Sequence, residues 1–211
     1  MRDKVEDIDE LKKIATQVRR DILQMVFNAS SGHPGGSLGC ADFMTALYFR
    51  VMTQSDEFKM DAKNEDAFIM SNGHISPVLY SVLARKGYFP VEELSTFRKL
   101  NTRLQGHPTT HEGLPGIRTA TGSLGQGFSV GVGMALAKKM DKDPGFVFVS
   151  TGDGELQEGQ IWEAAMFAPF PKLDNLIVTV DWNGQQIDGT NDQVLSLGDL
   201  AGKWRTLGWS A

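Results

Sequence analysis

Two short polar turns in this sequence carry the residue types that bind hard metal ions. Asp153 lies in the turn Gly-Asp-Gly-Glu, and Asn183 lies further along the chain in the turn Asp-Trp-Asn-Gly. Carboxylate and amide oxygens suit Mg2+ or Ca2+, and Gly154 would let a phosphate approach the backbone. Spacing alone fits equally well a polar strand-to-helix turn followed by an unrelated asparagine turn.

The segments around these turns are predicted to form a strand, a helix and a second strand. Residues 146–151 read FVFVST and residues 176–181 read LIVTVD, and such β-branched and aromatic runs are typical of buried strands. Between them, residues 156–168 repeat small and apolar side chains with helical spacing. A right-handed crossover makes the two strands parallel. Asp153 and Asn183 should therefore follow neighbouring strands at one edge of the sheet.

Strands that alternate with helices predict an α/β fold with a doubly wound, mainly parallel sheet flanked by helices. The other predicted elements are an amphipathic helix over 8–26, a helix capped by Ser37 and running to Tyr48, a strand over 67–70, a helix over 78–86 preceded by Ser76 as cap and Pro77, and helices over 91–100 and 126–139. Gly127, Gly131 and Ala135 give the last helix a face of small residues suited to close packing.

The predicted sheet is incomplete. Strand character is weaker around 118–121, and the chain stops at Ala211 where a further strand is expected. We therefore expect a sheet that is incomplete at the C-terminus and covered by a second chain.

Three of the four histidines share one sequence context. His33, His74 and His107 each follow a glycine, at a strand end or in a long turn. A single loop histidine is most often a surface residue, but three in this context favour hydrogen-bond donors or proton shuttles near neutral pH. His107 and His111 have the spacing of a metal-binding pair, but Pro108 breaks the helix that such a pair needs, so zinc is disfavoured.

The segment 101–127 has no sustained period, and a loop of that length inside a compact domain is usually functional. It ends in the turn Gly122-Ser123-Leu124-Gly125-Gln126-Gly127, whose exposed N–H groups could hold an anion or the edge of a heterocycle. Helix starts and tightly packed helices also use such glycines, so this signal is weak on its own.

Glu158 and Glu163 follow the Asp153 turn. A first-turn glutamate usually complements the helix dipole, and one that faces a partner chain could join a carboxylate relay.

The composition is that of an ordinary globular protein, with 211 residues, 22% charged, 41% hydrophobic and a formal net charge of −5. The negative charge argues against nucleic acid or an anionic membrane as partner, but a helix N-terminus or a metal could still hold a small anion. The single cysteine, Cys40, excludes an internal disulfide and a cysteine-based zinc site, which fits a reducing cytoplasm. The charged N-terminus and the absence of a long apolar run predict neither a signal peptide nor a membrane span.

Several motifs, taken in chain order, resemble one family. They are SSGHPGGSLG from Ser30, SNGH from Ser71, GHPTTHEGLPG from Gly106, TATGSLGQGFSVGVGMALA from Thr119, GDGELQEGQIWEA from Gly152 and DNLIVTVDWNGQQIDG from Asp174. They are similar to the thiamine-diphosphate-binding half of transketolase, and in particular to the N-terminal subunits of split transketolases. The resemblance implies that residues 1–211 form one domain of this kind, without the pyrimidine-binding and C-terminal domains.

The resemblance also implies site residues. The metal, Mg2+ or Ca2+, would be bound by the side chains of Asp153 and Asn183 and the carbonyl of Gln185. The remaining contacts would be Gly154 and His74 with the diphosphate, Gly122 and Leu124 with the aminopyrimidine, Ile187 with the thiazolium, His33 and His107 with the substrate hydroxyls and the oxygen where charge develops, and Glu158 with a second subunit.

The implied activity is transfer of a two-carbon ketol unit from a ketose phosphate to an aldose phosphate, as in the pentose phosphate pathway. In this family, the pyrimidine-binding half carries the glutamate that activates the aminopyrimidine. It also carries most of the arginines that bind the sugar phosphate. The expected partner is therefore a C-terminal transketolase subunit, with assembly into a dimer of heterodimers and no turnover by this chain alone. The chain ends before the family's first half normally does, which leaves both a natural split subunit and a truncated one open.

Two alternatives stay open. One is another thiamine-diphosphate enzyme, either deoxyxylulose-phosphate synthase-like or acting on a 2-oxoacid. The other is a non-catalytic binding or assembly module of the same fold. The His107-Pro108 pair and the SLGQG stretch from Ser123 favour transketolase. Ser123 itself stands where the commoner full-length enzymes have proline, a change also seen in split-type sequences.

Overall fold

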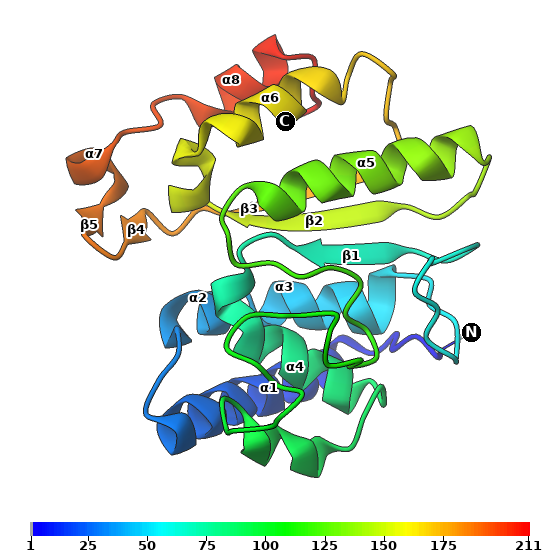
Figure 1. Ribbon diagram of the computed structural model, residues 1–211, viewed down its shortest axis with the longest axis vertical. Helices are drawn as coiled ribbons and strands as arrows, with labels where there is room; N and C mark the ends of the chain where they lie inside the picture. Colours follow the sequence, from blue (N-terminus) through cyan, green and yellow to red (C-terminus); the bar gives the residue numbers. More distant parts are fainter. Residues whose placement is uncertain (1) are drawn as a thin grey trace. The chain divides into compact units, whose positions relative to one another are not determined.

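The computed structural model describes residues 2–211, which fold into two compact units. The first unit comprises the chain up to Asp66 together with Gly73–Gly122, and the second comprises Ala67–Asn72 together with Ser123–Ala211. Figure 1 follows the chain from α1 in blue to α8 in red. The short strand β1 lies in the second unit although its sequence neighbours on both sides belong to the first.

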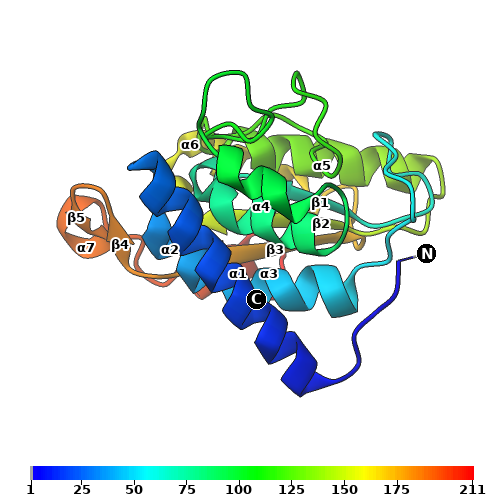
Figure 2. The same cartoon turned by 90° about the horizontal axis from the view of Figure 1, so that it is seen from below.

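The first unit is helical. Its elements are α1 (Ile8–Ala29), α2 (Pro34–Gly39), α3 (Ala41–Ala46), the π-helix η1 (Leu47–Val51), the 3-10 helix η2 (Gly73–Ile75), α4 (Ser76–Arg85) and the 3-10 helix η3 (Val91–Thr96). The predicted opening helix is confirmed, and α1 packs against α3 and α4 (Figure 2). Val18 and Ile22 are fully buried on its inner face, and Asp21 pairs there with Arg85 of α4 at 2.7 Å. None of the helices in residues 2–211 is long and apolar enough to cross a bilayer.

Two predicted helix starts and one predicted helix in this unit are wrong. Ser37 lies inside α2 instead of capping it, and its hydroxyl donates to the carbonyl of His33 at 2.8 Å. The helix starts earlier because Pro34, with its fixed φ, occupies the first turn. Ser76 likewise is the first helical residue of α4 rather than its cap. The helix expected over 91–100 is only the 3-10 helix η3.

The second unit contains a parallel sheet with the strand order β1-β2-β3. The strands are β1 (Ala67–Met70), β2 (Val147–Gly152) and β3 (Leu176–Asp181), so the expected strands and their parallel pairing are confirmed. The remaining elements are α5 (Gln126–Met140), η4 (Gly154–Gln157), α6 (Gly159–Phe167), β4 (Gln185–Gln186), β5 (Gly189–Thr190), α7 (Asn191–Val194) and α8 (Leu200–Thr206). The helix expected over 156–168 is thus split into η4 and α6. Residues 118–121 form no strand, contrary to the weak expectation there.

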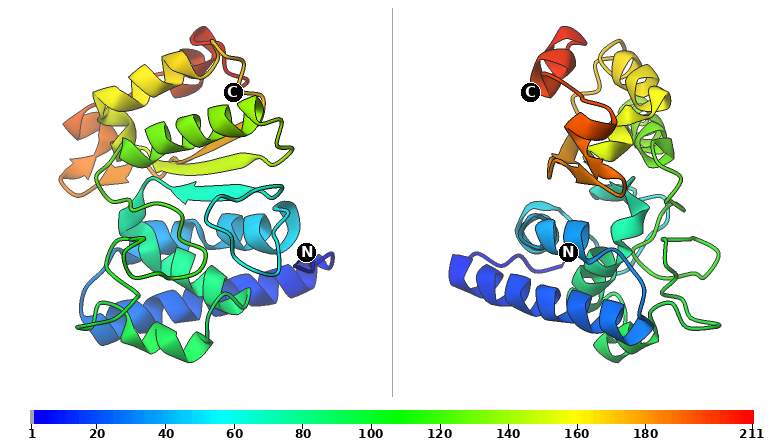
Figure 3. Two further views of the ribbon diagram at one scale, coloured as in Figure 1. Left: turned by 45° about the vertical axis from the view of Figure 1, so that its right-hand side comes forward. Right: turned by 90° about the vertical axis from the view of Figure 1, so that its left-hand side faces the viewer.

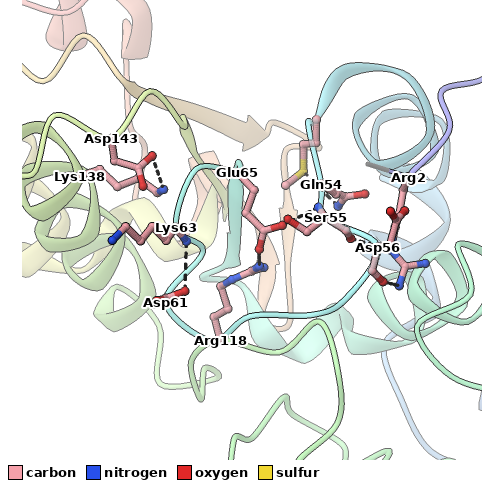
Figure 4. A network of polar contacts seen from close by, with 11 residues as sticks. Arg2, Gln54, Ser55, Asp56, Asp61, Lys63, Glu65, Arg118, Lys138 and Asp143 are labelled. Atoms are coloured by element: carbon pink, nitrogen blue, oxygen red, sulfur yellow. Dashed lines mark hydrogen bonds and ion pairs between the residues drawn. The ribbon is translucent and has the colours of Figure 1, made fainter.

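Long-range contacts hold the extended loop that follows η3. Figure 4 shows a buried ion pair near the end of this loop, in which Arg118 Nη2 lies 2.5 Å from Glu65 Oε1. Glu65 also accepts the N–H of Ser55 at 2.6 Å, and the Arg118 guanidinium lies over the ring of Phe58. Removal of one partner of such a buried pair leaves an uncompensated charge, which is costly. The pair therefore holds the end of the loop against the segment 55–65 that precedes β1.

The small face of α5 explains how this helix approaches the sheet, which it covers in Figure 3. A Cβ atom on Gly127 would lie 2.7 Å from the Cα of Ser71, and one on Gly131 would lie 2.4 Å from a methyl of Val149. A Cβ on Gly133 would meet nothing within 4 Å. The predicted close-packing role therefore holds for Gly127 and Gly131.

This contrast generates a matched pair of predictions. Gly127→Ala should lower the free energy of unfolding by about 1–3 kcal/mol, because the added methyl meets backbone that cannot move aside. Gly133→Ala should raise it by about 0.5–1 kcal/mol, because alanine is the better helix former. Urea unfolding followed by circular dichroism measures both. Equal effects of the two substitutions would contradict the packing argument.

Candidate functional site

Asp153, directly after β2, joins the two polar turns singled out by the sequence. It is 2% exposed. Its Oδ1 accepts the N–H of Gly154 at 2.8 Å, and its Oδ2 accepts the N–H of Gly184 at 2.6 Å. The N–H of Asp153 in turn donates to the carbonyl of Asp181 at 3.2 Å. The structure therefore brings the Asn183 turn against the Asp153 turn at the carboxyl ends of β2 and β3.

Asn183 is exposed, and its amide organises the turn in which it lies. Its Nδ2 donates to Asp181 Oδ2 at 3.1 Å, and its Oδ1 accepts the N–H of Gln185 at 2.8 Å. Gln185 opens the β4–β5 hairpin, at whose tip Ile187 is 91% exposed. Ile187 thus presents an apolar side chain to solvent next to a polar turn.

The oxygen atoms at these turns fit a hard divalent cation. Each carboxylate oxygen of Asp153 and the amide oxygen of Asn183 accepts one hydrogen bond, which leaves each atom a free lone pair. Within residues 2–211 there is no group of three His, Cys, Asp or Glu side chains that could hold a metal. A cation here would therefore depend on amide and backbone carbonyl oxygens, and on the oxygens of an anionic ligand, which is the donor set that Mg2+ accepts.

Glu155, two residues beyond Asp153, is a central residue of the second unit that the sequence analysis missed. It is 2% exposed, and its Oε1 accepts the hydroxyl of Ser71 and the N–H of Gly125, the latter at 2.7 Å. Its Oε2 accepts the N–H of Gly152 at 3.0 Å. Burial raises the pKa of this carboxyl, and the three hydrogen bonds oppose the rise. One side chain thus joins the ends of β1 and β2 to the start of α5.

The glycine turn before α5 is less open than expected. The N–H of Gly125 is bonded to Glu155, and the N–H of Phe128 donates to Ser71 Oγ at 3.0 Å. These two groups are therefore not exposed donors for an anion. Leu124 is half-buried, and its carbonyl accepts Nε2 of Gln160 at 2.9 Å.

In the first unit, the structure brings the three glycine-linked histidines together. The rings of His33 and His74 meet edge to face, with centroids 5.0 Å apart. The ring of His107 lies so close to Gly122 that a Cβ there would be 2.6 Å from its Cδ2. Gly122 has a φ of +133°, so it must be glycine for conformational reasons as well. His111 is exposed, and its N–H donates to Thr109 Oγ1 at 3.2 Å.

The surroundings of His74 and His107 lower the pKa of both rings and so favour neutral imidazoles. Burial lowers the pKa of His74 to about 4, and the neighbouring His33 and His107 lower it further. Burial also lowers the pKa of His107, with added contributions from the charges of Arg98 and His33. A neutral imidazole has one N–H donor and one acceptor nitrogen, so the rings of His74 and His107 can each donate one hydrogen bond and accept another.

The two glutamates after the Asp153 turn are exposed. Glu158 is the N-cap residue of α6 and makes no capping hydrogen bond with its side chain, and Glu163 lies within the same helix. Both are therefore accessible to a partner chain.

The family described as "Transketolase, thiamine diphosphate binding domain" matches residues 11–211. The chain belongs to this family. It is 44% identical over 200 residues to a 6-deoxy-6-sulfo-D-fructose transketolase subunit of Clostridium sp., covering 95% of this chain and 72% of that protein. It is 42% identical to an apulose-4-phosphate transketolase subunit of Phocaeicola vulgatus, covering 96% of this chain and 71% of that protein.

Solved transketolases have the same fold. The structure from Campylobacter jejuni superposes with a TM-score of 0.88 at 32% identity, covering 96% of this chain and 32% of that one. The chain therefore spans about a third of a full-length transketolase. The resemblance drawn from the motifs, the α/β class and the assignment to a transketolase-type transferase are confirmed.

The role of Glu155 can be tested on the chain alone. Glu155→Gln should lower the free energy of unfolding by about 2–3 kcal/mol, because an NH2 group cannot accept the bonds that a carboxylate oxygen accepts. Glu163→Gln, an exposed change of the same kind, should stay within about 0.5 kcal/mol of the parent. Urea unfolding measures both, and a parent-like Glu155→Gln would show that the buried carboxylate is dispensable.

The buried histidine predicts a pH dependence. The pKa of His74 falls from 6.5 in an unfolded chain to about 4 in the folded protein. The unfolded state therefore binds more protons between these values, so stability is lost as the pH falls from about 6.5 towards 4. An NMR titration of the His74 ring should show the low midpoint, and His74→Gln should remove that part of the stability loss. A midpoint at or above 6.5 would contradict the effect of burial.

Proposed function

We propose that this chain is the cofactor-binding portion of an enzyme that transfers a two-carbon ketol unit from a ketose phosphate to an aldose phosphate. The observation that carries the proposal is the 2.6 Å bond from Gly184 N–H to Asp153, which holds two hard oxygen donors at one sheet edge. The transketolase family membership supports the same reaction class. Both relatives named above are described as acting on sugars with an anionic group, which supports a phosphorylated or similar substrate.

In this proposal, Asp153, Asn183 and the carbonyl of Gln185 bind Mg2+, with Ca2+ as a substitute. The other contacts are Gly154 and His74 with the diphosphate, Gly122 and Leu124 with the aminopyrimidine, and Ile187 with the thiazolium. When bound there, thiamine diphosphate would supply a nucleophilic carbon for reaction with a ketose carbonyl. The chain holds this group in place and keeps its hydrogen-bonding partners fixed beforehand, so that little reorganisation is needed during reaction.

His33 and His107 are proposed to act on the substrate. The pKa of His107 is lowered, so near neutral pH its ring is uncharged and can donate to one oxygen while it accepts from another. That suits a sugar, whose hydroxyl groups are both donors and acceptors. It also suits an oxygen on which negative charge develops, since a donor fixed beforehand stabilises that charge.

A companion chain is part of the proposal. The proposed partner is a C-terminal transketolase subunit with the pyrimidine-binding domain, assembled with this chain as a dimer of heterodimers in the cytoplasm, with Glu158 at the contact. The naming of the relatives as transketolase subunits supports a divided enzyme. The alternatives, another thiamine-diphosphate enzyme or a non-catalytic module, become outcomes of the following experiment.

Removal of the Asp153 carboxylate tests the metal site. In the complex with the companion, Asp153→Ala should weaken Mg2+-dependent binding of thiamine diphosphate by more than about 100-fold, because loss of a supporting residue around a metal already costs 10- to 100-fold. Asp174→Ala, which removes an exposed carboxylate paired with Lys139, should leave binding unchanged. Titration calorimetry with and without Mg2+ measures both.

Unchanged affinity in Asp153→Ala would refute the ligand assignment. The same complex should transfer a ketol unit between sugar phosphates. Decarboxylation of a 2-oxoacid instead would favour the first alternative, and the absence of any heat on titration of the parent complex would favour the non-catalytic module.

A further inference from the structure

His107 lies in a loop without helix or strand, yet the backbone on both sides of it is anchored. The carbonyl of Gln105 accepts the hydroxyl of Tyr80 at 2.8 Å, and the carbonyl of Gly106 accepts the hydroxyl of Ser76 at 2.9 Å. On the other side, the carbonyl of Pro108 accepts the N–H of Thr121 at 3.1 Å. Three of the four carbonyls from 105 to 108 are therefore fixed by groups from elsewhere in the first unit.

The two hydroxyl donors come from one face of α4. Ser76 and Tyr80 are one helical turn apart, and each is 0% exposed. A hydroxyl buried without a partner is costly, and each of these two has its partner in the loop. The Tyr80 ring also packs edge to face against Phe97, where the loop leaves η3.

The loop has little room to move around His107. The guanidinium of Arg98 lies against Gly106, where a Cβ would be 2.6 Å from Arg98 Cζ. The His107 ring itself lies against Gly122, as described above. With the backbone held at three carbonyls and the ring held against a glycine, His107 has a defined position although no regular secondary structure supports it.

We propose that Tyr80 and Ser76 are positioning residues for His107. Their hydroxyls hold the carbonyls just before His107 and so fix where its imidazole is presented. The inference rests on the proposed function, in which His107 contacts the substrate sugar. A misplaced imidazole would weaken that contact, so the effect of losing either hydroxyl should fall on substrate binding and pass through His107.

The test compares Tyr80→Phe with a tyrosine that packs elsewhere. Tyr88 lies against Phe58 and under the guanidinium of Arg2, so Tyr88→Phe is the matched control. In the complex with the companion, Tyr80→Phe should raise KM for the ketose about 5- to 10-fold, as expected for one lost hydrogen bond, and leave thiamine diphosphate affinity unchanged. Ser76→Ala should act in the same direction, and Tyr88→Phe should leave KM unchanged.

A double-mutant cycle separates positioning from general stability. If Tyr80 acts through His107, Tyr80→Phe should cause no further rise in KM in a His107→Ala background. An equal rise in both backgrounds, or a lower Tm with no change in KM, would overturn the proposal.

The chain alone gives a readout that does not depend on the reaction. Tyr80→Phe should shift or broaden the NMR signals of the His107 ring, and Tyr88→Phe should leave them in place. Unchanged His107 signals in Tyr80→Phe would also overturn the proposal. A parent complex without ketol transfer would instead count against the proposed function, and the ring signals would then decide the anchoring by themselves.

Discussion

Asp153 uses both oxygens of its buried carboxylate to join the turn after β2 to the turn after β3. The parallel register makes this possible, because it pairs Gly152 with Asp181 and ends both strands at one edge. The buried carboxylate of Glu155 likewise accepts hydrogen bonds from the end of β1 and from the start of α5. Two carboxylates two residues apart in the sequence thus join the turns after β1, β2 and β3 and the start of α5. A metal site built there would have ligands with fixed positions.

The charges of the chain bear on how it could hold a diphosphate. The formal net charge is −5, and the lowered pKa values of His74 and His107 keep both rings uncharged near neutral pH. The N–H groups of Gly125 and Phe128, at the start of α5, are already bonded to Glu155 and Ser71. These histidines and N–H groups therefore offer a phosphate little positive charge. A divalent cation on Asp153 and Asn183 would supply it, which makes metal and anion binding interdependent in the proposed site.

The parts of this structure that were predictable from the sequence are those with local causes. Strands 67–70 and 176–181 follow from short β-branched and apolar runs, and the small face of α5 follows from glycines spaced by four residues. The start of α2 was misplaced because Ser37 resembles a cap while Pro34 sets the first turn. Glu155 was missed because its partners Ser71 and Gly125 are distant in sequence, and no local pattern reveals such a bond.

The long loop that carries His107 is also held by contacts that the sequence did not predict. A histidine on a helix would be oriented by the helix, but it would also be confined to the directions that a helix allows. The loop frees His107 from this constraint, and the lost rigidity is restored by contacts from α4, from Thr121 and from the Glu65–Arg118 pair. Each of these contacts joins residues far apart in the sequence. The motif around His107 was therefore recognisable from the sequence, whereas the groups that hold it in place could be found only from the fold.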